Sequence, residues 1–173
     1  ARIAAGLTDT TGGILAEDYV WSFATQPPKV VWVSPSEDAT LVGVETAVQV
    51  TFNMPVDTDS AKAAFHLRAG RQDVPGTITV DGATLTFTPT ERLAFDTTYS
   101  VRVDAGVQSV AGGAGMREDY EWRFTTVPLP RILRTEPYDG QQDAPPYTAF
   151  VIYFNAPINP DTVMPNLEMT PPL

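Results

Sequence analysis

The chain repeats part of itself at an interval of about 100 residues. Residues 17–28 read EDYVWSFATQPP and residues 118–130 read EDYEWRFTTVPLP, so the two segments share the skeleton E-D-Y-x-W-x-F-x-T-x-P. A second pair of blocks follows, with VTFNMPVDTD at 50–59 and IYFNAPINPD at 152–161. Because two separate blocks recur at nearly the same interval, the sequence predicts tandem structural units.

The phase of the repeat predicts how these units are divided. Each unit begins after a proline-rich segment, first Pro27-Pro28 and then Pro128-Leu129-Pro130. We therefore expect one complete unit at 29–127. Residues 1–28 would be the C-terminal strands of a preceding unit, and residues 128–173 the N-terminal strands of a following one. This division also predicts that the chain is a piece of a longer protein.

Strand patterns dominate the central unit, and stretches with helical periodicity are nearly absent. Apolar and polar side chains alternate over residues 48–52, which is the period of two expected for a half-buried strand. The same alternation occurs over 99–103 and 120–124. It predicts that Trp122 and Phe124 point into a common core.

Local signals add detail to this pattern. Asp81-Gly82 separates the strand-like runs 77–80 and 83–87, which predicts a hairpin with a type I′ turn. Residues 57–62 predict a turn or a single helical turn, because Asp and Ser favour capping positions. Tyr99 has two interpretations, a tyrosine corner or an ordinary core residue.

These signals together indicate an all-β fold. About seven short strands, with turn signals every 8–12 residues, are typical of an Ig-like β-sandwich. The segments SPSEDATLV at 34–42, VTFNMPVD at 50–57, GTITVDGATLTFTP at 76–89 and EDYEWRFTT at 118–126 resemble the bacterial Ig-like domain family first defined in surface-layer proteins. The resemblance covers 29–127 and both partial neighbours. It implies tandem β-sandwiches of secreted and surface-anchored bacterial proteins, without shared catalytic or cofactor residues.

The last segment carries a second resemblance. Residues 136–173 are similar to Ig-like modules near the N-terminus of bacterial α2-macroglobulin-type proteins. This resemblance implies that the parent protein is a protease trap of the cell envelope. The bait region and thioester motif of such traps do not occur in this chain.

Composition excludes several functional classes. The formal net charge is −10 and no basic cluster occurs, which argues against binding to nucleic acid or to anionic lipid. The chain has no Cys, so disulfides, thiolate zinc sites, iron–sulfur clusters and Cys nucleophiles are excluded. Its single His, His66, excludes a multi-His metal site and leaves one candidate general base. No apolar run reaches the 18 residues that would predict a membrane-spanning helix.

Oxygen ligands that could bind Ca²⁺ recur after the same predicted strand of the repeat. Asp57 and Asp59 lie two positions apart and could bind Ca²⁺ together with Asp119, and Asn159 and Asp161 recur at the same place in the repeat. The D-x-[DN]-x-[DN]-G loop pattern is absent. Capping of a short turn is the simpler explanation, so we assign no metal ligand and no cofactor.

The other polar candidates have structural explanations. His66 lies between two apolar residues of a predicted strand and should therefore face solvent. The serines at 22, 34, 60, 100 and 109 lack a G-x-S-x-G context. The loop at 112–115 is followed by neither Lys nor a helix, which argues against phosphate binding. We assign no catalytic residue.

The tryptophans follow the repeat. Trp21 and Trp122 occupy the same repeat position, which predicts core packing for both. Trp32 has Arg134 at its equivalent position, so we expect it to be exposed or to lie at a junction between modules. Glu17-Asp18 begins a predicted strand, where charge deters edge-to-edge pairing.

Our leading hypothesis is a non-enzymatic spacer module of a larger bacterial surface or secreted protein, located outside the cell or in its envelope. One alternative is an adhesion or partner-binding module that acts through the loops at 68–76 or 105–117. Another is an accessory domain of an α2-macroglobulin-type protease inhibitor. The expected partners are neighbouring Ig-like modules, with no nucleic acid and no membrane insertion by this segment.

The two terminal pieces pose a separate question. Each should expose an apolar face, which is Tyr19, Trp21 and Phe23 in the first piece and residues 150–154 in the last. These faces either complement each other, within one chain or between chains, or belong to frayed ends.

Overall fold

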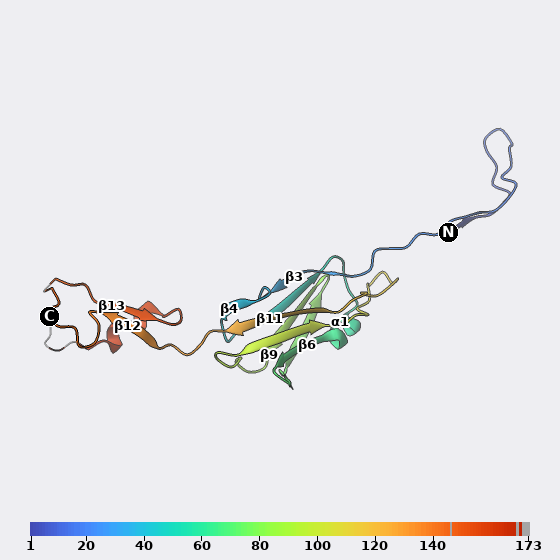
Figure 1. Ribbon diagram of the computed structural model, residues 1–173. Helices are drawn as coiled ribbons and strands as arrows, with labels where there is room; N and C mark the ends of the chain where they lie inside the picture. The colour runs from blue at the N-terminus through green and yellow to red at the C-terminus, as the bar shows by residue number, and fades with distance from the viewer. Residues whose placement is uncertain (146, 169, 171–173) are drawn as a thin grey trace.

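The computed structural model describes residues 1–145, 147–168 and 170. Figure 1 shows an N-terminal hairpin, a larger central part and a small C-terminal part, joined by single extended segments. The hairpin pairs β1 (Arg2–Ile3) with β2 (Tyr19–Val20). The C-terminal part pairs β12 (Ile132–Glu136) with β13 (Val151–Phe154), which the short 3-10 helices η1 (Pro160–Thr162) and η2 (Met164–Asn166) follow.

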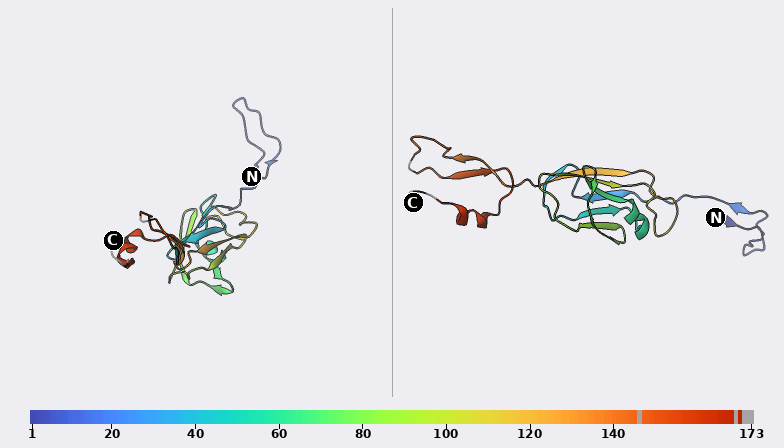
Figure 2. Two further views of the ribbon diagram at one scale, coloured as in Figure 1. Left: turned by 60° about the vertical axis from the view of Figure 1, so that its left-hand side comes forward. Right: turned by 90° about the horizontal axis from the view of Figure 1, so that it is seen from below.

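The central part is built of two sheets, and the all-β prediction is confirmed. The four-stranded sheet has the order β3-β5-β9-β8, with β3 (Val30–Ser34), β5 (Val48–Phe52), β8 (Gly76–Asp81) and β9 (Thr84–Pro89). The five-stranded sheet has the order β4-β11-β10-β6-β7, with β4 (Ala39–Val42), β6 (Phe65–Ala69), β7 (Gln72–Asp73), β10 (Thr98–Val103) and β11 (Tyr120–Thr126). In Figures 1 and 2 the chain enters this sandwich at one end and leaves it at the other.

The core lies between the two sheets, where the predicted inward faces meet. Val48 and Val50 are fully buried, and Trp122 and Phe124 are only 4% and 1% exposed. The strand period of two therefore placed these residues correctly. The ring of Phe124 stacks on that of Tyr99, with 5.5 Å between their centroids.

The predicted hairpin at 77–87 has the right strands but the wrong turn. Asp81 pairs with Thr84, so the loop residues are Gly82 and Ala83 rather than Asp81 and Gly82. Only Gly82 in this loop has a positive φ, whereas a type I′ turn needs two. The observed register keeps the same side chains inward and brings Val80 opposite Leu85, which the predicted register would not do.

The segment after β5 forms one helix, α1 (Thr58–Ala64), at the end of the sandwich that faces the N-terminal hairpin (Figures 1 and 2). Asp57 is its N-cap, and its side chain accepts a hydrogen bond from Ser60 N at 2.9 Å. The capping that the sequence predicted is confirmed, and Ala61 and Ala64 bury one side of the helix against the core.

Tyr99 forms the tyrosine corner. Its hydroxyl accepts a hydrogen bond from Ala94 N at 2.8 Å, five residues upstream, and the side chain is 3% exposed. The hydroxyl of Thr126 closes the same turn, because it donates to Ala94 O at 2.6 Å and accepts from Thr97 N at 3.0 Å. The turn before β10 is thus held by two side chains from two strands of one sheet.

Candidate functional site

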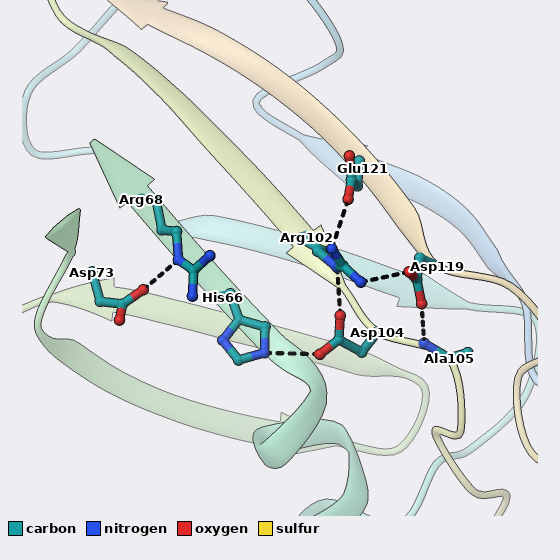
Figure 3. Close-up of polar contacts among 8 residues, drawn as sticks. All are labelled: His66, Arg68, Asp73, Arg102, Asp104, Ala105, Asp119 and Glu121. Atoms are coloured by element: carbon teal, nitrogen blue, oxygen red, sulfur yellow. Dashed lines mark hydrogen bonds and ion pairs between the residues drawn. The ribbon is translucent and has the colours of Figure 1, made fainter. Parts of the chain in front are cut away.

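Polar side chains gather on the outer face of the five-stranded sheet, around Arg102 on β10 (Figure 3). The guanidinium group of Arg102 donates to Asp104, and its Nη2 lies 2.6 Å from Asp119 Oδ2. Its Nη1 lies 3.2 Å from Oε1 of Glu121 on β11. His66, which pairs with Arg102 across β6 and β10, places Nε2 3.0 Å from Asp104 Oδ2.

Three carboxylates of this cluster, those of Asp104, Asp119 and Glu121, share the one guanidinium group of Arg102. Burial by itself would raise the pKa of Asp104, but hydrogen bonds from Arg102 and His66 outweigh it and lower the pKa below its usual value. The carboxylate of Asp104 in turn raises the pKa of Arg102. The side chains of Arg102 and Asp104 are 46% and 38% exposed, so solvent screens these ion pairs and each contributes little stability. The cluster fixes side-chain positions at the surface.

An open hollow of about 370 Å³ lies beside this cluster, lined in part by His66, Arg68, Arg102 and Arg123. The arginines that line this hollow already form ion pairs with carboxylates. Arg68 pairs with Asp73 at 2.6 Å, which lowers the pKa of Asp73, and Arg123 pairs with Asp38 at 2.8 Å. Each arginine that lines the hollow is therefore already paired with a carboxylate.

No described hydrogen bond joins His66 to a serine hydroxyl. His66 is half-exposed on the outer face, as predicted, and its partner is a carboxylate. A Ser nucleophile would need His66 as a hydrogen-bonded base. The arrangement around His66 is that of a side-chain hydrogen bond to a carboxylate at a sheet surface.

The residues that were weighed as Ca²⁺ ligands, and to which no metal was assigned, have other partners. Hydrogen bonds from the backbone and side chain of Ser60 lower the pKa of Asp57, which caps α1. Asp119 instead binds Arg102 and accepts from Ala105 N at 2.8 Å. Asn159 caps η1 by accepting from Asp161 N. Among residues 1–145, 147–168 and 170, no group of three His, Cys, Asp or Glu side chains is placed to hold a metal ion.

The three tryptophans lie in different surroundings. Trp122 is buried and its Nε1 donates to Pro35 O at 3.0 Å, which confirms its predicted core role. Trp32 is 52% exposed on β3. Trp21 is 40% exposed and does not pack in a core within the described chain, which agrees with the exposed apolar face expected for the first terminal piece, because nothing in the described chain packs over β2 as the second sheet packs over β11.

The contacts around Asp119 recur in the N-terminal hairpin. Arg2 forms an ion pair with Asp18, whose Oδ1 accepts from Ala5 N at 2.9 Å. These contacts correspond one to one with those that Asp119 makes in the central sandwich. Our sequence interpretation did not single out the arginines, although the repeat itself aligns Arg2 with Arg102 and Asp18 with Asp119.

Asn53 fastens the linker before β3 to the end of β5. Its Oδ1 accepts from Lys29 N at 2.8 Å, and its Nδ2 donates to Pro27 O at 3.3 Å. The backbone of Asn53 also donates to Lys29 O at 2.9 Å. One side chain thus holds both sides of Pro28 in the linker.

Asn155 repeats this arrangement at the next linker. Its Oδ1 accepts from Arg131 N at 2.7 Å, and its Nδ2 donates to Leu129 O at 3.1 Å. The strand pair β12–β13 also has the register of β3–β5, including an irregularity after its first residue pair. We call Asn53 and Asn155, each with its two linker contacts, the linker clamps.

A comparison with family models matches residues 24–126 to the bacterial Ig-like domain. The chain belongs to the bacterial Ig-like domain family. This confirms the family resemblance and the Ig-like fold that the sequence predicted. The family is generally non-catalytic. Among the described residues, no helix is long and apolar enough to cross a membrane.

Solved structures similar to this chain come from several kinds of protein. The N-terminal part of the bacterial S-layer protein SbsC is 25% identical, with 64% of this chain and 26% of that one covered and a TM-score of 0.44. An L,D-transpeptidase from Mycobacterium smegmatis is 24% identical, with 62% and 42% covered and a TM-score of 0.43. Native alpha-2-macroglobulin from Escherichia coli, domains MG0-NIE-MG1, is 20% identical, with 63% and 35% covered and a TM-score of 0.45.

Each of the three TM-scores is below 0.5. The chain spans about a quarter of the length of the SbsC structure and less than half of the transpeptidase. No match was found among proteins with curated descriptions.

Proposed function

We propose that this chain is a non-enzymatic structural part of a larger bacterial surface or secreted protein, in which Ig-like modules follow one another as a spacer. The observation that carries this proposal is the recurrence of the linker clamps. Asn53 and Asn155 hold their linkers by the same pair of side-chain hydrogen bonds, at 2.7–3.3 Å. Repeated contacts at linkers are what a string of modules requires.

The linkers are restrained in two ways. Proline fixes φ near −65°, and the linkers contain Pro27-Pro28 and Pro128-Leu129-Pro130. Each clamp then ties the backbone on both sides of the last linker proline to a strand pair. A linker that is short, rich in proline and held at its end transmits orientation better than a flexible one.

The loop at 105–117 supports a structural role over partner binding. Gly106 N donates to Met116 O at 2.7 Å, and Met116 N donates to Val107 O at 2.8 Å. Val107 and Met116 are buried in the core. Equivalent hydrogen bonds run from Gly6 N to Leu15 O and from Leu15 N to Leu7 O in the N-terminal hairpin, so the loop is a repeated element of the fold.

The cellular setting is part of the proposal. Membership of the bacterial Ig-like family supports a bacterial surface or secreted protein. An accessory role in an α2-macroglobulin-type protease inhibitor is the alternative that the resemblance of residues 136–173 implies.

Small-angle X-ray scattering of the full chain, diluted to its monomeric state, tests the spacer proposal. We expect the double variant Asn53→Ala/Asn155→Ala to show a broader distance distribution than the wild type, because both linkers lose their clamps. Asn166→Ala is the matched control, since its side chain donates only to Thr162 O within η1 and η2. An unchanged distribution in the double variant would contradict the proposal.

A second measurement tests whether the chain binds a metal ion or a polysaccharide. Thermal unfolding of the full chain is followed with calcium chloride and with soluble bacterial cell-wall polysaccharide. A spacer shows no saturable shift in Tm with either. A saturable shift that disappears in an Asp57→Ala or Trp32→Ala variant would favour a binding module.

A further inference from the structure

One regular strand of the central sandwich has no strand partner on one of its two sides. Strand β8 ends the four-stranded sheet and pairs only with β9 in the described chain. The register of β8 with β9 has no irregularity along its whole length. We call the unpaired side of β8 the β8 edge. It belongs to the complete central unit, so it does not depend on where the chain begins or ends.

The other three edge strands of the sandwich carry features that hinder the addition of a further strand. The register of β3 is irregular between Val30 and Trp32, β4 contains Leu41 at a φ of +56°, and β7 has only two residues. The residues of β8 include no Lys, Arg or Pro, and their only charge is that of Asp81. A long edge strand without such protection is a template for pairing with another chain.

The backbone groups of Ile78 and Val80 point out from the β8 edge. A two-residue loop follows Asp81, which makes Asp81 and Thr84 a hydrogen-bonded pair, and such pairs alternate along an antiparallel ladder. The amide and carbonyl groups of Ile78 and Val80 therefore face away from β9. No hydrogen bond from a turn, loop or cap of the described chain reaches them. Their side chains are only half-buried against the core.

We propose that the β8 edge of one copy pairs in antiparallel orientation with the β8 edge of a second copy, with Thr79 opposite Thr79. In this register Ile78 faces Val80 of the other copy, and Thr77 faces Asp81. The two four-stranded sheets then form one continuous sheet, and the outward backbone groups form about four hydrogen bonds between the copies.

The occupant is a second copy because the β8 edge is complementary to itself. On the inner face, Ile78 and Val80 of the two copies meet and extend the apolar core. On the outer face, the hydroxyl of Thr77 donates to the carboxylate of Asp81. The two Asp81 residues lie about 14 Å apart along the strands, which exceeds the screening length of about 8 Å at physiological salt. Parallel pairing in register would place these carboxylates side by side.

The symmetry of the contact limits the size of the assembly. The same strand takes part from both copies, so the contact is twofold and closes at a dimer. It joins two molecules side by side through their central sandwiches. This inference goes beyond the spacer proposal and does not involve the linker clamps, so either can fail without the other.

Sedimentation velocity of the full chain, from roughly micromolar to millimolar concentration, is the test. The wild type should form dimers as concentration rises. Thr79→Lys and Thr79→Glu should each weaken dimerisation by about fivefold or more, because like charges then lie directly opposite each other across the contact. Thr86→Lys and Thr86→Glu are the matched controls. Thr86 pairs with Thr79 within the sheet, so they add the same charge to the same face one strand away from the edge, and they should dimerise like the wild type.

Mixing the two charged variants tests both the register and the identity of the partner. An equimolar mixture of the Thr79→Lys and Thr79→Glu chains should dimerise at least as strongly as the wild type, because opposite charges then face each other. Such recovery also shows that both variants are folded. A wild type that stays monomeric over the whole range would leave the edge to a different partner and would overturn the proposal. Dimerisation that neither substitution at Thr79 weakens would also overturn it, as would a mixture that dimerises no better than either variant alone.

Discussion

Removal of one oxygen atom from Tyr99 should measurably destabilise the central sandwich. In Tyr99→Phe the ring and its stacking on Phe124 remain, but Ala94 N loses its acceptor at 2.8 Å. An amide left without a partner in a partly buried turn costs about 1–2 kcal/mol of the free energy of unfolding. With an m-value of about 1.5 kcal/mol/M, the urea midpoint should fall by about 1 M.

Urea unfolding of the full chain, followed by tryptophan fluorescence, measures this loss because Trp122 is buried. Tyr120→Phe is the matched control, since no described hydrogen bond reaches its hydroxyl and its midpoint should hardly move. Thr126→Val should cost more than Tyr99→Phe, about 2–3 kcal/mol, because it leaves both Ala94 O and Thr97 N without a partner.

The double variant Tyr99→Phe/Thr126→Val examines whether the two side chains hold one turn. Both act on residues 94–97, so their effects should be non-additive by about 0.5 kcal/mol or more. Equal midpoints for Tyr99→Phe, Tyr120→Phe and the wild type would show that the corner contributes nothing to stability, and the reasoning would fail.

Three further substitutions have defined outcomes. Hydrogen bonds from Ser60 lower the pKa of Asp57 below its ordinary value of 3.8, so this carboxylate stabilises the fold above that pH and the contribution is lost as pH falls through the folded-state pKa. Asp57→Asn keeps a capping side chain without a charge. The loss of stability that follows protonation of Asp57 should therefore be missing from its acid unfolding curve. Gly76→Ala would place a Cβ 2.2 Å from Phe87 Cζ and 2.7 Å from Thr88 O, so it should cost about 2–3 kcal/mol by urea unfolding. Gly70→Ala meets nothing within 4 Å and bears only the strain of its φ of +60°, about 1 kcal/mol; an equal loss in both variants would refute the steric argument.

The sequence predicted the strands that have one buried and one exposed face. Residues 48–52 and 99–103 alternate in burial as they alternate in polarity, because a strand in a two-layer sandwich has one face in the core. Strand β4 lacks this signal. Its residues are half-buried or exposed, it contains Leu41 at a φ of +56°, and it meets β11 at only two paired positions.

The turn at Gly82 could not be fixed by polarity alone. A register shift by two residues leaves every side chain on its face, so the alternation is satisfied by either turn. What separates the two registers is the packing of large side chains such as Val80 against Leu85, which is a property of the assembled sheet.

The contacts of the polar cluster also depend on strand register, which polarity alone does not determine. Alternation predicted that His66 faces outward, and it does. Its partner Asp104 lies 38 residues away and is brought to it by the register of β6 with β10. The Arg2–Asp18 and Arg102–Asp119 pairs could have been predicted from the sequence, because the repeat aligns Arg2 with Arg102 and Asp18 with Asp119.

The linker clamps tie the stiffness of a connection to events that occur later in synthesis. Asn53 lies 24 residues after Lys29, the residue whose amide it holds. The linker emerges from the ribosome before β5. It therefore stays flexible until β5 has emerged and paired with β3. During synthesis, a module whose strands are incomplete can therefore change its orientation relative to the module before it. Its orientation becomes fixed only after β3 and β5 have paired and Asn53 has bound the linker.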